Sequence, residues 1–353
     1  MRELPFTVVE RGSEVGSSWR RHYDRLHLHT DRGHSALPHL GFPAGTPRYP
    51  SRAQVIAYLE EYARRFDVIP HLNEEAQTIR PASGRWITTT TSGVYDSQQV
   101  VVATGYNAVP NMPRWPGQER FTGPIIHSSE YRNGKPFRGQ SVLVVGIGNS
   151  GGEIAIDLHE SGARAALAVR GAVNIVPRDI LGIPILTLGI ALSRLPPRLT
   201  DALAARLCGL SLGDITKLGF RRLPLGPLAQ IRTQGRIPLI DVGTVRLIRQ
   251  GHIQLFGDIR EISETRVTFD DRRSRQFDAI IVATGFRPET ERFFEPQSAV
   301  SPALGIGSPS EAAGEAGLYF CGFVVSASGM LREIGREAQR IVADIARRAS
   351  RQN

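Results

Sequence analysis

The stretch QSVLVVGIGNSGGEIAIDLHESGARAALAVRG, Gln140–Gly171, decides the fold of this 353-residue chain. Its apolar start, Ser141–Val145, predicts a buried strand, and its apolar end, Ala166–Val169, predicts a second one. Between them, three glycines at G-x-G-x-x-G spacing open a segment with helical apolar periodicity. We therefore predict a strand–turn–helix–strand unit, the local structure that binds the pyrophosphate of a dinucleotide.

Each glycine of this motif has a separate physical task. Gly146 permits the tight turn, Gly148 lets the backbone approach the pyrophosphate, and Gly151 lets the helix and strand pack closely. The helix start adds free N–H groups and a positive dipole end. Alone the motif is weak evidence, but here it lies between the strand and the helix that it requires. The predicted NADP contacts in this loop are Gly146, Gly148, Asn149, Ser150 and Gly151.

Arg170 ends the second predicted strand, about where an NAD-specific fold carries Asp or Glu. A guanidinium group there can bind a 2′-phosphate. It cannot accept the hydrogen bond from the ribose hydroxyl of NAD that an Asp or Glu accepts at this position. We therefore predict that NADP is preferred to NAD. The alternative interpretation is an exposed arginine at a strand end.

Composition indicates a soluble globular protein of about two domains. Hydrophobic residues make up 41% of the chain and charged residues 22%, which allows a sizeable core. Two cysteines cannot build a disulfide framework, no cluster suggests a metal site, and no secretory signal is visible, so we expect a cytoplasmic location. The net charge of +9 is spread along the chain without an aromatic-interleaved basic stripe, which argues against a nucleic-acid partner.

One apolar stretch, ILGIPILTLGIAL at Ile180–Leu192, raises the question of a membrane segment. It is shorter than the ~20 residues that a spanning helix needs, and Pro184 weakens it further as a helix. We predict buried chain or the wall of an apolar pocket, with a surface-attached segment as the alternative. With its neighbour Leu195–Leu212 it is where we expect a substrate pocket, because such pockets are commonly apolar.

Two similar segments that lie far apart in the sequence suggest two related nucleotide-binding units. QQVVVATGYNAVP at Gln98–Pro110 is similar to FDAIIVATGFRPE at Phe277–Glu289. In each, an apolar strand runs into Ala-Thr-Gly and a following turn. We expect each copy to close one nucleotide-binding domain.

The segment FTGPIIHSSEYR, Phe121–Arg132, lies between the first ATG-containing segment and the glycine loop. It resembles the F-x-G-x-x-x-H-x-x-x-Y identifying sequence of class B flavin monooxygenases, and the whole chain resembles the flavin-containing monooxygenases. GFRRLPLGPL at Gly219–Leu228 and GRIPLIDVGTVRLIRQGHIQ at Gly235–Gln254 resemble the C-terminal half of the YUCCA-like branch. The alternative for FTGPIIHSSEYR is a linker with a chance match, which the flanking motifs disfavour.

The resemblance implies an α/β fold of two doubly wound Rossmann-like domains, with the NADP domain inserted into the FAD domain. The expected limits are 1–135 and 285–353 for the FAD domain and 136–284 for the NADP domain. It further implies an NADPH- and FAD-dependent monooxygenase that inserts one atom of O2 into a small organic substrate, an aromatic 2-oxo acid such as indole-3-pyruvate being the candidate. The alternatives are an NADPH-dependent flavin, disulfide or quinone reductase without oxygenation and a non-catalytic NADP-binding protein.

The family's first G-x-G-x-x-G, for the FAD pyrophosphate, is absent from this sequence. We expect either a start assigned too far downstream or a true truncation, and weak FAD retention in consequence. Phe6–Val9 reads as a buried strand that ends at Glu10, in the place of the family's ribose-binding acid. His29 stands where animal members carry an asparagine beside the flavin. The FAD contacts that the resemblance implies are Glu10, Gly16, Trp19, Thr30, Thr104, Gly105 and Gly322.

For NADP the resemblance adds a histidine and the return crossing between the domains. His127 is predicted to position the cofactor, the alternative being an ordinary surface or hydrogen-bonding histidine. Thr284 and Gly285 resemble the return crossing. No Ser-His-Asp set and no convincing carboxylate pair is visible, so the catalytic residues stay unassigned, as fits chemistry performed by a cofactor. The sequence leaves the oligomeric state open.

Overall fold

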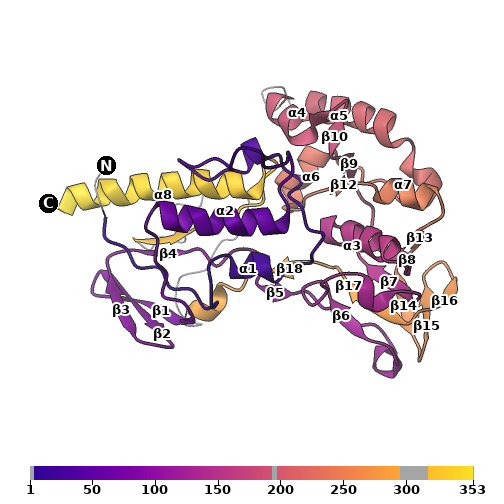
Figure 1. Cartoon of the computed structure of the whole chain (residues 1–353), viewed down its shortest axis with the longest axis horizontal. Helices are drawn as coiled ribbons and strands as arrows, with labels where there is room; N and C mark the ends of the chain where they lie inside the picture. The colour runs from indigo at the N-terminus through magenta and orange to yellow at the C-terminus, as the bar shows by residue number, and fades with distance from the viewer. Residues whose placement is uncertain (1–3, 193–196, 295–316, 353) are drawn as a thin grey trace. The chain divides into compact units, whose positions relative to one another are not determined.

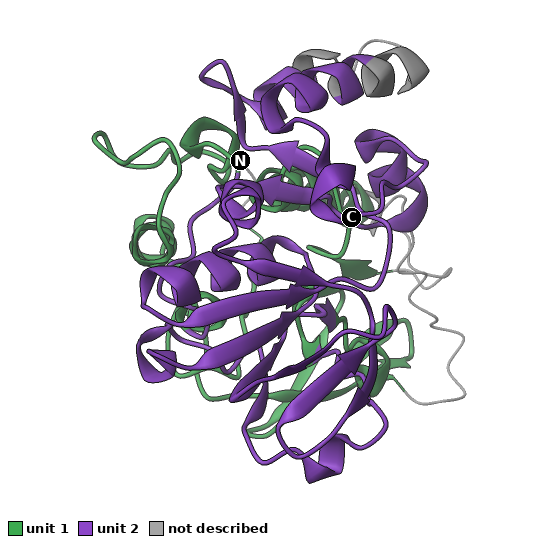
Figure 2. Ribbon diagram, turned by 90° about the vertical axis from the view of Figure 1, so that its right-hand side faces the viewer, with its two compact units in different colours: residues 1–20, 30–109, 287–353 green, residues 21–29, 110–286 purple. Residues whose placement is uncertain are grey.

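The computed structural model describes residues 4–192, 197–294 and 317–352. The chain forms two compact units, shown in green and purple in Figure 2. Unit 1 comprises residues 1–20, 30–109 and 287–353, and unit 2 comprises residues 21–29 and 110–286. The main part of unit 2 is thus inserted between parts of unit 1, as the resemblance implies. The limits predicted from the sequence concern the cofactor that each part binds, and they stay a prediction.

Unit 2 is built on a parallel five-stranded sheet with the strand order β13-β8-β7-β17-β6 (Figure 1). The two predicted strands of the glycine motif are the central strand β7 and its neighbour β8, and the second ATG-containing segment follows β17. Along the chain the sheet grows outward from β7 to β13 and then returns to β17, which is doubly wound order. The strands are β6 (Ile125–His127), β7 (Ser141–Val145), β8 (Arg164–Ala168), β13 (Gln254–Phe256) and β17 (Ala279–Val282).

Both faces of this sheet are covered, which explains its unbroken apolar strands. On one face, Ile154 and Leu158 of helix α3 (Asn149–Glu160) pack on Val142 and Val144. On the other, Leu143 and Val145 pack against aromatic rings of β13 and of the antiparallel sheet β14-β15-β16. These strands are β14 (Ile259–Ile262), β15 (Arg266–Phe269) and β16 (Ser274–Gln276).

The remaining elements of unit 2 are two small strand pairs, four helices and three 3-10 turns within the described residues. Strand β12 pairs in parallel with β9, and β10 and β11 form a hairpin. The helices are α4 (Ile185–Leu192), α5 (Pro197–Leu212), α6 (Pro227–Gln234) and α7 (Thr244–Arg249), with the 3-10 turns η2 (Gln118–Arg120), η3 (Lys135–Phe137) and η4 (Ile215–Leu218). The strands are β9 (Ile175–Pro177), β10 (Asp179–Ile180), β11 (Ile183–Pro184) and β12 (Leu239–Asp241).

Unit 1 combines an antiparallel sheet, β1-β2-β3, with the parallel pair β4–β19. The first ATG-containing segment follows β4, as predicted, and the chain ends with helix α8. The two-residue strands β5 (Val109–Pro110) and β18 (Phe286–Arg287) form a separate pair, and each contains a point where the chain passes from one unit to the other. The other elements are α1 (Ser17–Arg20), η1 (Arg32–His34), α2 (Arg52–Arg65), β1 (Ala76–Ala82), β2 (Arg85–Thr90), β3 (Val94–Ser97), β4 (Val100–Val102), η5 (Glu291–Phe293), β19 (Leu318–Phe320) and α8 (Met330–Gln352).

The predicted buried strand at residues 6–9 is wrong, and so is the buried-chain interpretation of residues 180–192, whereas the alternative that residues 180–192 line an apolar pocket stays a prediction. Residues 6–9 do not form a buried strand, because only Val9 has a bridge partner, His71, and Phe6 is 68% exposed. Residues 180–192 form a hairpin and helix α4 instead of continuous buried chain, and Leu181 at the hairpin tip is 98% exposed. Leu195 of the neighbouring stretch lies outside the described residues. Within the described part of the chain, no helix is long and apolar enough to cross a membrane.

Candidate functional site

The glycine loop of unit 2 has the geometry that its spacing predicts. Gly146 adopts φ +107°, and a Cβ on it would lie 2.5 Å from the carbonyl oxygen of Ala283. A Cβ on Gly151 would lie 2.1 Å from the carbonyl oxygen of Gly146. A Cβ on Gly148 would meet nothing within 4 Å. Two of the glycines therefore allow the chain to pack, whereas Gly148 faces open space that a ligand can enter.

This open space lies at the start of helix α3. Gly148 is the N-cap and provides no side-chain hydrogen bond, so the first N–H groups of the helix have no partner within it. The side chains of Asn149 and Ser150 are engaged elsewhere: Asn149 Oδ1 accepts a hydrogen bond from the N–H of Ile240 at 2.8 Å, and Ser150 hydrogen-bonds to Tyr23. These two residues can therefore offer their backbone N–H groups to an anion.

The return strand borders the same loop. The strand order reverses between β7 and β17, and ligands of doubly wound sheets bind at the carboxyl ends beside such a reversal. Thr284 follows β17 and donates its hydroxyl hydrogen to the carbonyl oxygen of Asn111. The N–H of Asn111 donates to the Gly285 carbonyl oxygen at 2.9 Å, and Gly285 has φ +83°. Thr284 and Gly285 thus end β17 in a turn fixed by Asn111.

His127 ends β6 and is buried, so it is not a surface histidine. Its Nε2 lies 3.1 Å from the carbonyl oxygen of Gly285, and its Nδ1 lies 3.0 Å from the Ser129 hydroxyl. Burial lowers the pKa of His127, which favours the neutral ring. The ring also meets Phe286 edge to face. His127 therefore ties the ends of β6 and β17 together, and its contact with a cofactor stays a prediction.

The identifying segment 121–132 is anchored to helix α3 by Tyr131. Its buried hydroxyl donates to Asp157 Oδ2 at 2.6 Å, and the N–H of Gly134 donates to the same oxygen at 2.9 Å. Burial, and then the Asp157 carboxylate, raise the pKa of Tyr131. The tyrosine of this motif therefore has a clear structural task, which is to hold the segment against α3.

Replacement of Tyr131 by phenylalanine should lower the free energy of unfolding by about 1–2 kcal/mol, because a hydrogen bond to a charged acceptor is lost while the ring stays in place. Urea unfolding followed by circular dichroism measures this loss. Asp157→Asn, which keeps both acceptor contacts with a neutral group, should cost less. An unchanged urea midpoint for Tyr131→Phe would show that the hydroxyl does not stabilise the fold.

A buried polar cluster beside α3 was missed by the sequence analysis. His29 pairs through Nε2 with Glu153, whose carboxylate is buried in the helix. Tyr23 lies against the same carboxylate, and burial raises the pKa of its hydroxyl, with Glu153 adding to the effect. His29, expected beside a flavin, is thus held by α3 within unit 2. No local signal reveals this, because the partners are more than a hundred residues apart in the sequence.

A cavity of about 390 Å³ opens at the carboxyl end of β8. In dinucleotide-binding folds this strand end holds the adenosine ribose. Arg170 itself, the predicted 2′-phosphate ligand, is exposed there. Its lining includes Val169, Gly171, Arg221, Gly257, Asp270, Asp271 and Arg273.

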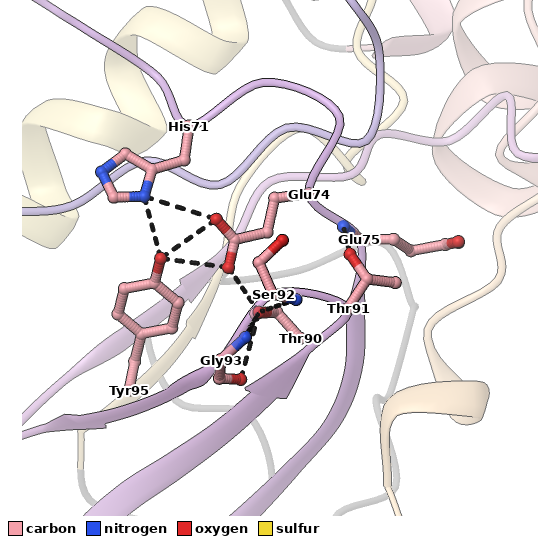
Figure 3. A network of polar contacts seen from close by, with 8 residues as sticks. All are labelled: His71, Glu74, Glu75, Thr90, Thr91, Ser92, Gly93 and Tyr95. Atoms are coloured by element: carbon pink, nitrogen blue, oxygen red, sulfur yellow. Dashed lines mark hydrogen bonds and ion pairs between the residues drawn. The ribbon is translucent and has the colours of Figure 1, made fainter.

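In unit 1, Glu10 is held by its neighbours along the chain. Its Oε1 accepts a hydrogen bond from the Gly12 N–H at 2.6 Å, and its N–H donates to the His71 carbonyl oxygen at 2.9 Å. The turn that begins at His71 is fixed by Glu74, a buried carboxylate bound by the hydroxyls of Thr90 and Tyr95 (Figure 3). The acid predicted to hold the FAD ribose is therefore on a firmly supported segment.

The other predicted FAD contacts of unit 1 lie mainly at turns. Gly16, Gly105 and Gly322 have φ of +74°, +79° and +88°, which favour glycine. Trp19 is in α1, directly after the turn at Gly16, and its N–H donates to the Gly16 carbonyl oxygen at 2.9 Å. Thr30 Oγ1 lies 2.5 Å from Ser35 Oγ. Thr104 is exposed after β4.

Gly322 is fixed by a residue that the sequence analysis missed. Its N–H donates to Oε2 of Glu337 at 2.6 Å, and Glu337 is buried within α8. Burial raises the pKa of Glu337, and the nearby Glu333 adds to the effect. The signal available in the sequence is only an acidic residue on the apolar side of an amphipathic helix.

Comparisons with known proteins agree with this geometry. A family model described as pyridine nucleotide-disulphide oxidoreductase matches residues 2–178. The probable indole-3-pyruvate monooxygenase YUCCA1 of Arabidopsis thaliana is 41% identical over 81% of this chain and 70% of its own length. The indole-3-pyruvate monooxygenase YUCCA1 of Oryza sativa subsp. japonica is 38% identical over 91% of this chain and 81% of its own.

Solved structures show the same fold at lower identity. A flavin-containing monooxygenase from Stenotrophomonas maltophilia aligns with a TM-score of 0.72 at 21% identity, covering 97% of this chain and 92% of that one. A cyclohexanone monooxygenase aligns with a TM-score of 0.72 at 17% identity, covering 98% and 83%. The predicted α/β class with two Rossmann-like domains is confirmed. The chain therefore belongs to the YUCCA-like branch of the flavin-containing monooxygenases, oxidoreductases that use a flavin and a pyridine nucleotide.

Proposed function

We propose that this protein is an NADPH- and FAD-dependent monooxygenase whose substrate is an aromatic 2-oxo acid, with indole-3-pyruvate as the first candidate. The observation that carries the proposal is the identity of 38–41% with relatives named as indole-3-pyruvate monooxygenases. This similarity extends over 81–91% of the chain, so it includes residues of both units.

The residues of unit 2 fit a pyridine dinucleotide. Gly148 leaves space for a pyrophosphate, and the first N–H groups of α3 can donate to its oxygens. We assign the adenosine end to the carboxyl end of β8, where Arg170 would attract a 2′-phosphate. His127, Thr284 and Gly285 border the reversal between β7 and β17, where we expect the nicotinamide half.

In unit 1 the proposed FAD contacts are the ribose acid Glu10, the turns at Gly16, Gly105 and Gly322, and the nearby residues Trp19, Thr30 and Thr104. When bound, the flavin supplies the redox and oxygen chemistry, and the protein binds, orients and excludes water. Glu10 and the backbone at Gly322 are held in place by hydrogen bonds, so both are suited to such positioning. The substrate pocket expected at residues 180–192 stays a prediction.

A thiol-dependent reductase is the less favoured alternative. Such enzymes need a reactive thiolate, and both cysteines here are buried. Burial raises the pKa of Cys208 to about 11 and that of Cys321 to about 12. Cys208 is in unit 2 and Cys321 is in unit 1, and each is a free thiol. Their environment therefore suits packing better than disulfide exchange.

Product analysis with the full chain, added FAD and NADPH tests the proposal. Each turnover should consume one indole-3-pyruvate, one NADPH, one O2 and one proton, and yield indole-3-acetate, CO2, NADP⁺ and water. With ¹⁸O2, one labelled atom should appear in the acetate and the other in water. NADPH oxidation that yields only hydrogen peroxide would indicate a flavin reductase, and NADP⁺ binding without any oxidation would indicate a non-catalytic protein.

A further inference from the structure

We propose that Arg221 is a second specificity-determining residue, which binds the 2′-phosphate of NADPH together with Arg170. The inference rests on the proposed use of NADPH. It adds a residue of unit 2 that lies outside the strand–turn–helix–strand segment 140–171. It begins from a contact that joins residues 51 positions apart in the sequence.

The backbone places Arg221 beside the end of β8. The N–H of Val173 donates to the carbonyl oxygen of Arg221 at 2.8 Å, and the N–H of Leu223 donates to that of Val173 at 3.1 Å. The guanidinium of Arg221 then donates through Nη2 to the backbone carbonyl oxygen of Arg170. The Arg221 guanidinium therefore reaches the backbone of Arg170 at the end of β8, and both residues are exposed.

The cavity at this strand end contains Arg221. Val169 and Gly171 line it from the end of β8, and Gly257 lines it from the end of β13. Because the adenosine ribose of a dinucleotide lies at the end of this second strand, a 2′-phosphate on it would reach the same place. Arg221 still has further N–H donors in its fork beside the one that binds the Arg170 carbonyl, and a guanidinium can bind phosphate oxygens in pairs.

The other charged side chains in the cavity favour a second arginine for binding a phosphate. Asp271 and Arg273 pair at 2.6 Å, and this contact lowers the pKa of Asp271, so the two charges largely cancel. Asp270 also lines the cavity and repels a phosphate. A phosphate monoester carries about −1.5 to −2 charges at neutral pH. Arg170 and Arg221 together supply the positive charge that this group needs in the presence of Asp270.

Binding measurements test the role of Arg221 without any catalytic readout. Isothermal titration of the full chain gives dissociation constants for NADP⁺ and NAD⁺, which differ only in the 2′-phosphate. We expect Arg221→Ala to weaken NADP⁺ binding at least about tenfold, or 1.4 kcal/mol, and NAD⁺ binding less than about twofold. Arg221→Lys keeps the charge but loses the forked guanidinium. Its dissociation constant for NADP⁺ should therefore lie between those of the unmodified chain and Arg221→Ala. Arg222→Ala is the matched control, because this neighbouring arginine is also exposed and should leave both constants unchanged.

The outcomes separate this inference from the proposed cofactor. If the unmodified chain prefers NADP⁺ and Arg221→Ala keeps that preference, or weakens both nucleotides equally, Arg221 does not read the 2′-phosphate. If the unmodified chain binds both nucleotides equally, the proposed NADPH dependence fails as well. A loss confined to NADP⁺ in Arg221→Ala, with Arg222→Ala unaffected, supports the assignment.

Discussion

Gly148→Ala should fold like the unmodified chain and lose at least about tenfold in affinity for NADP⁺. The new Cβ would meet no protein atom within 4 Å, and φ at this residue is −81°, which alanine adopts readily. Alanine is a poorer N-cap than glycine, so a loss of stability below about 1 kcal/mol is expected. The methyl group would, however, occupy the space through which a pyrophosphate approaches the N–H groups of α3. Thermal unfolding and isothermal titration with NADP⁺ measure the two effects separately.

Gly151→Ala is the matched control with the opposite expectation. Its Cβ would lie 2.1 Å from the carbonyl oxygen of Gly146, a separation that forces the backbone apart. We expect this variant to unfold at a much lower temperature or to fail to fold, because helix α3 can no longer pack on the loop. If Gly148→Ala bound NADP⁺ as tightly as the unmodified chain, the pyrophosphate would not lie at this turn.

The sequence predicted the central part of unit 2 because the information there is local. The whole motif lies within about twenty residues: the strand Ser141–Val145, the three glycines and the helix after them. The residue types of each segment favour one local structure. The family resemblance added the α/β class and the inserted arrangement. The predicted strand at 6–9 failed because strand formation depends on a hydrogen-bonded neighbour, and composition does not reveal whether one is present.

The residues that support the site were not predictable, because their partners are distant in the chain. Arg221 meets Arg170, and Glu153 meets His29, only after the fold brings them together. In addition, the sequence does not distinguish a ligand-binding arginine from an ordinary arginine on the surface. What identifies Arg221 is its contact with one backbone carbonyl and its place in a cavity, and both are properties of the folded chain.

Replacement of Glu337 should strongly destabilise the candidate FAD region. It is the hydrogen-bond acceptor for the Gly322 N–H, and that N–H is buried with it. Glu337→Ala leaves this donor without a partner and creates a cavity between α8 and the segment at Gly322. We therefore expect the free energy of unfolding to fall by about 2–4 kcal/mol. Glu337→Gln keeps an acceptor oxygen and should lose far less at acidic pH.

The pH dependence of these variants tests the cause of the effect. Burial raises the pKa of Glu337 above its ordinary value of 4.5, so the folded chain keeps a proton that the unfolded chain releases. Between the unfolded and the folded pKa, stability contributed by this group is present at the acidic end and is lost as pH rises, by up to about 1.4 kcal/mol per pH unit. Glu337→Gln cannot lose a proton, so its urea midpoint should decline less over this window, and at the alkaline end it should equal or exceed that of the unmodified chain. Parallel pH profiles for the two proteins would show that Glu337 has an ordinary pKa and that the packing of Gly322 alone explains the loss in Glu337→Ala.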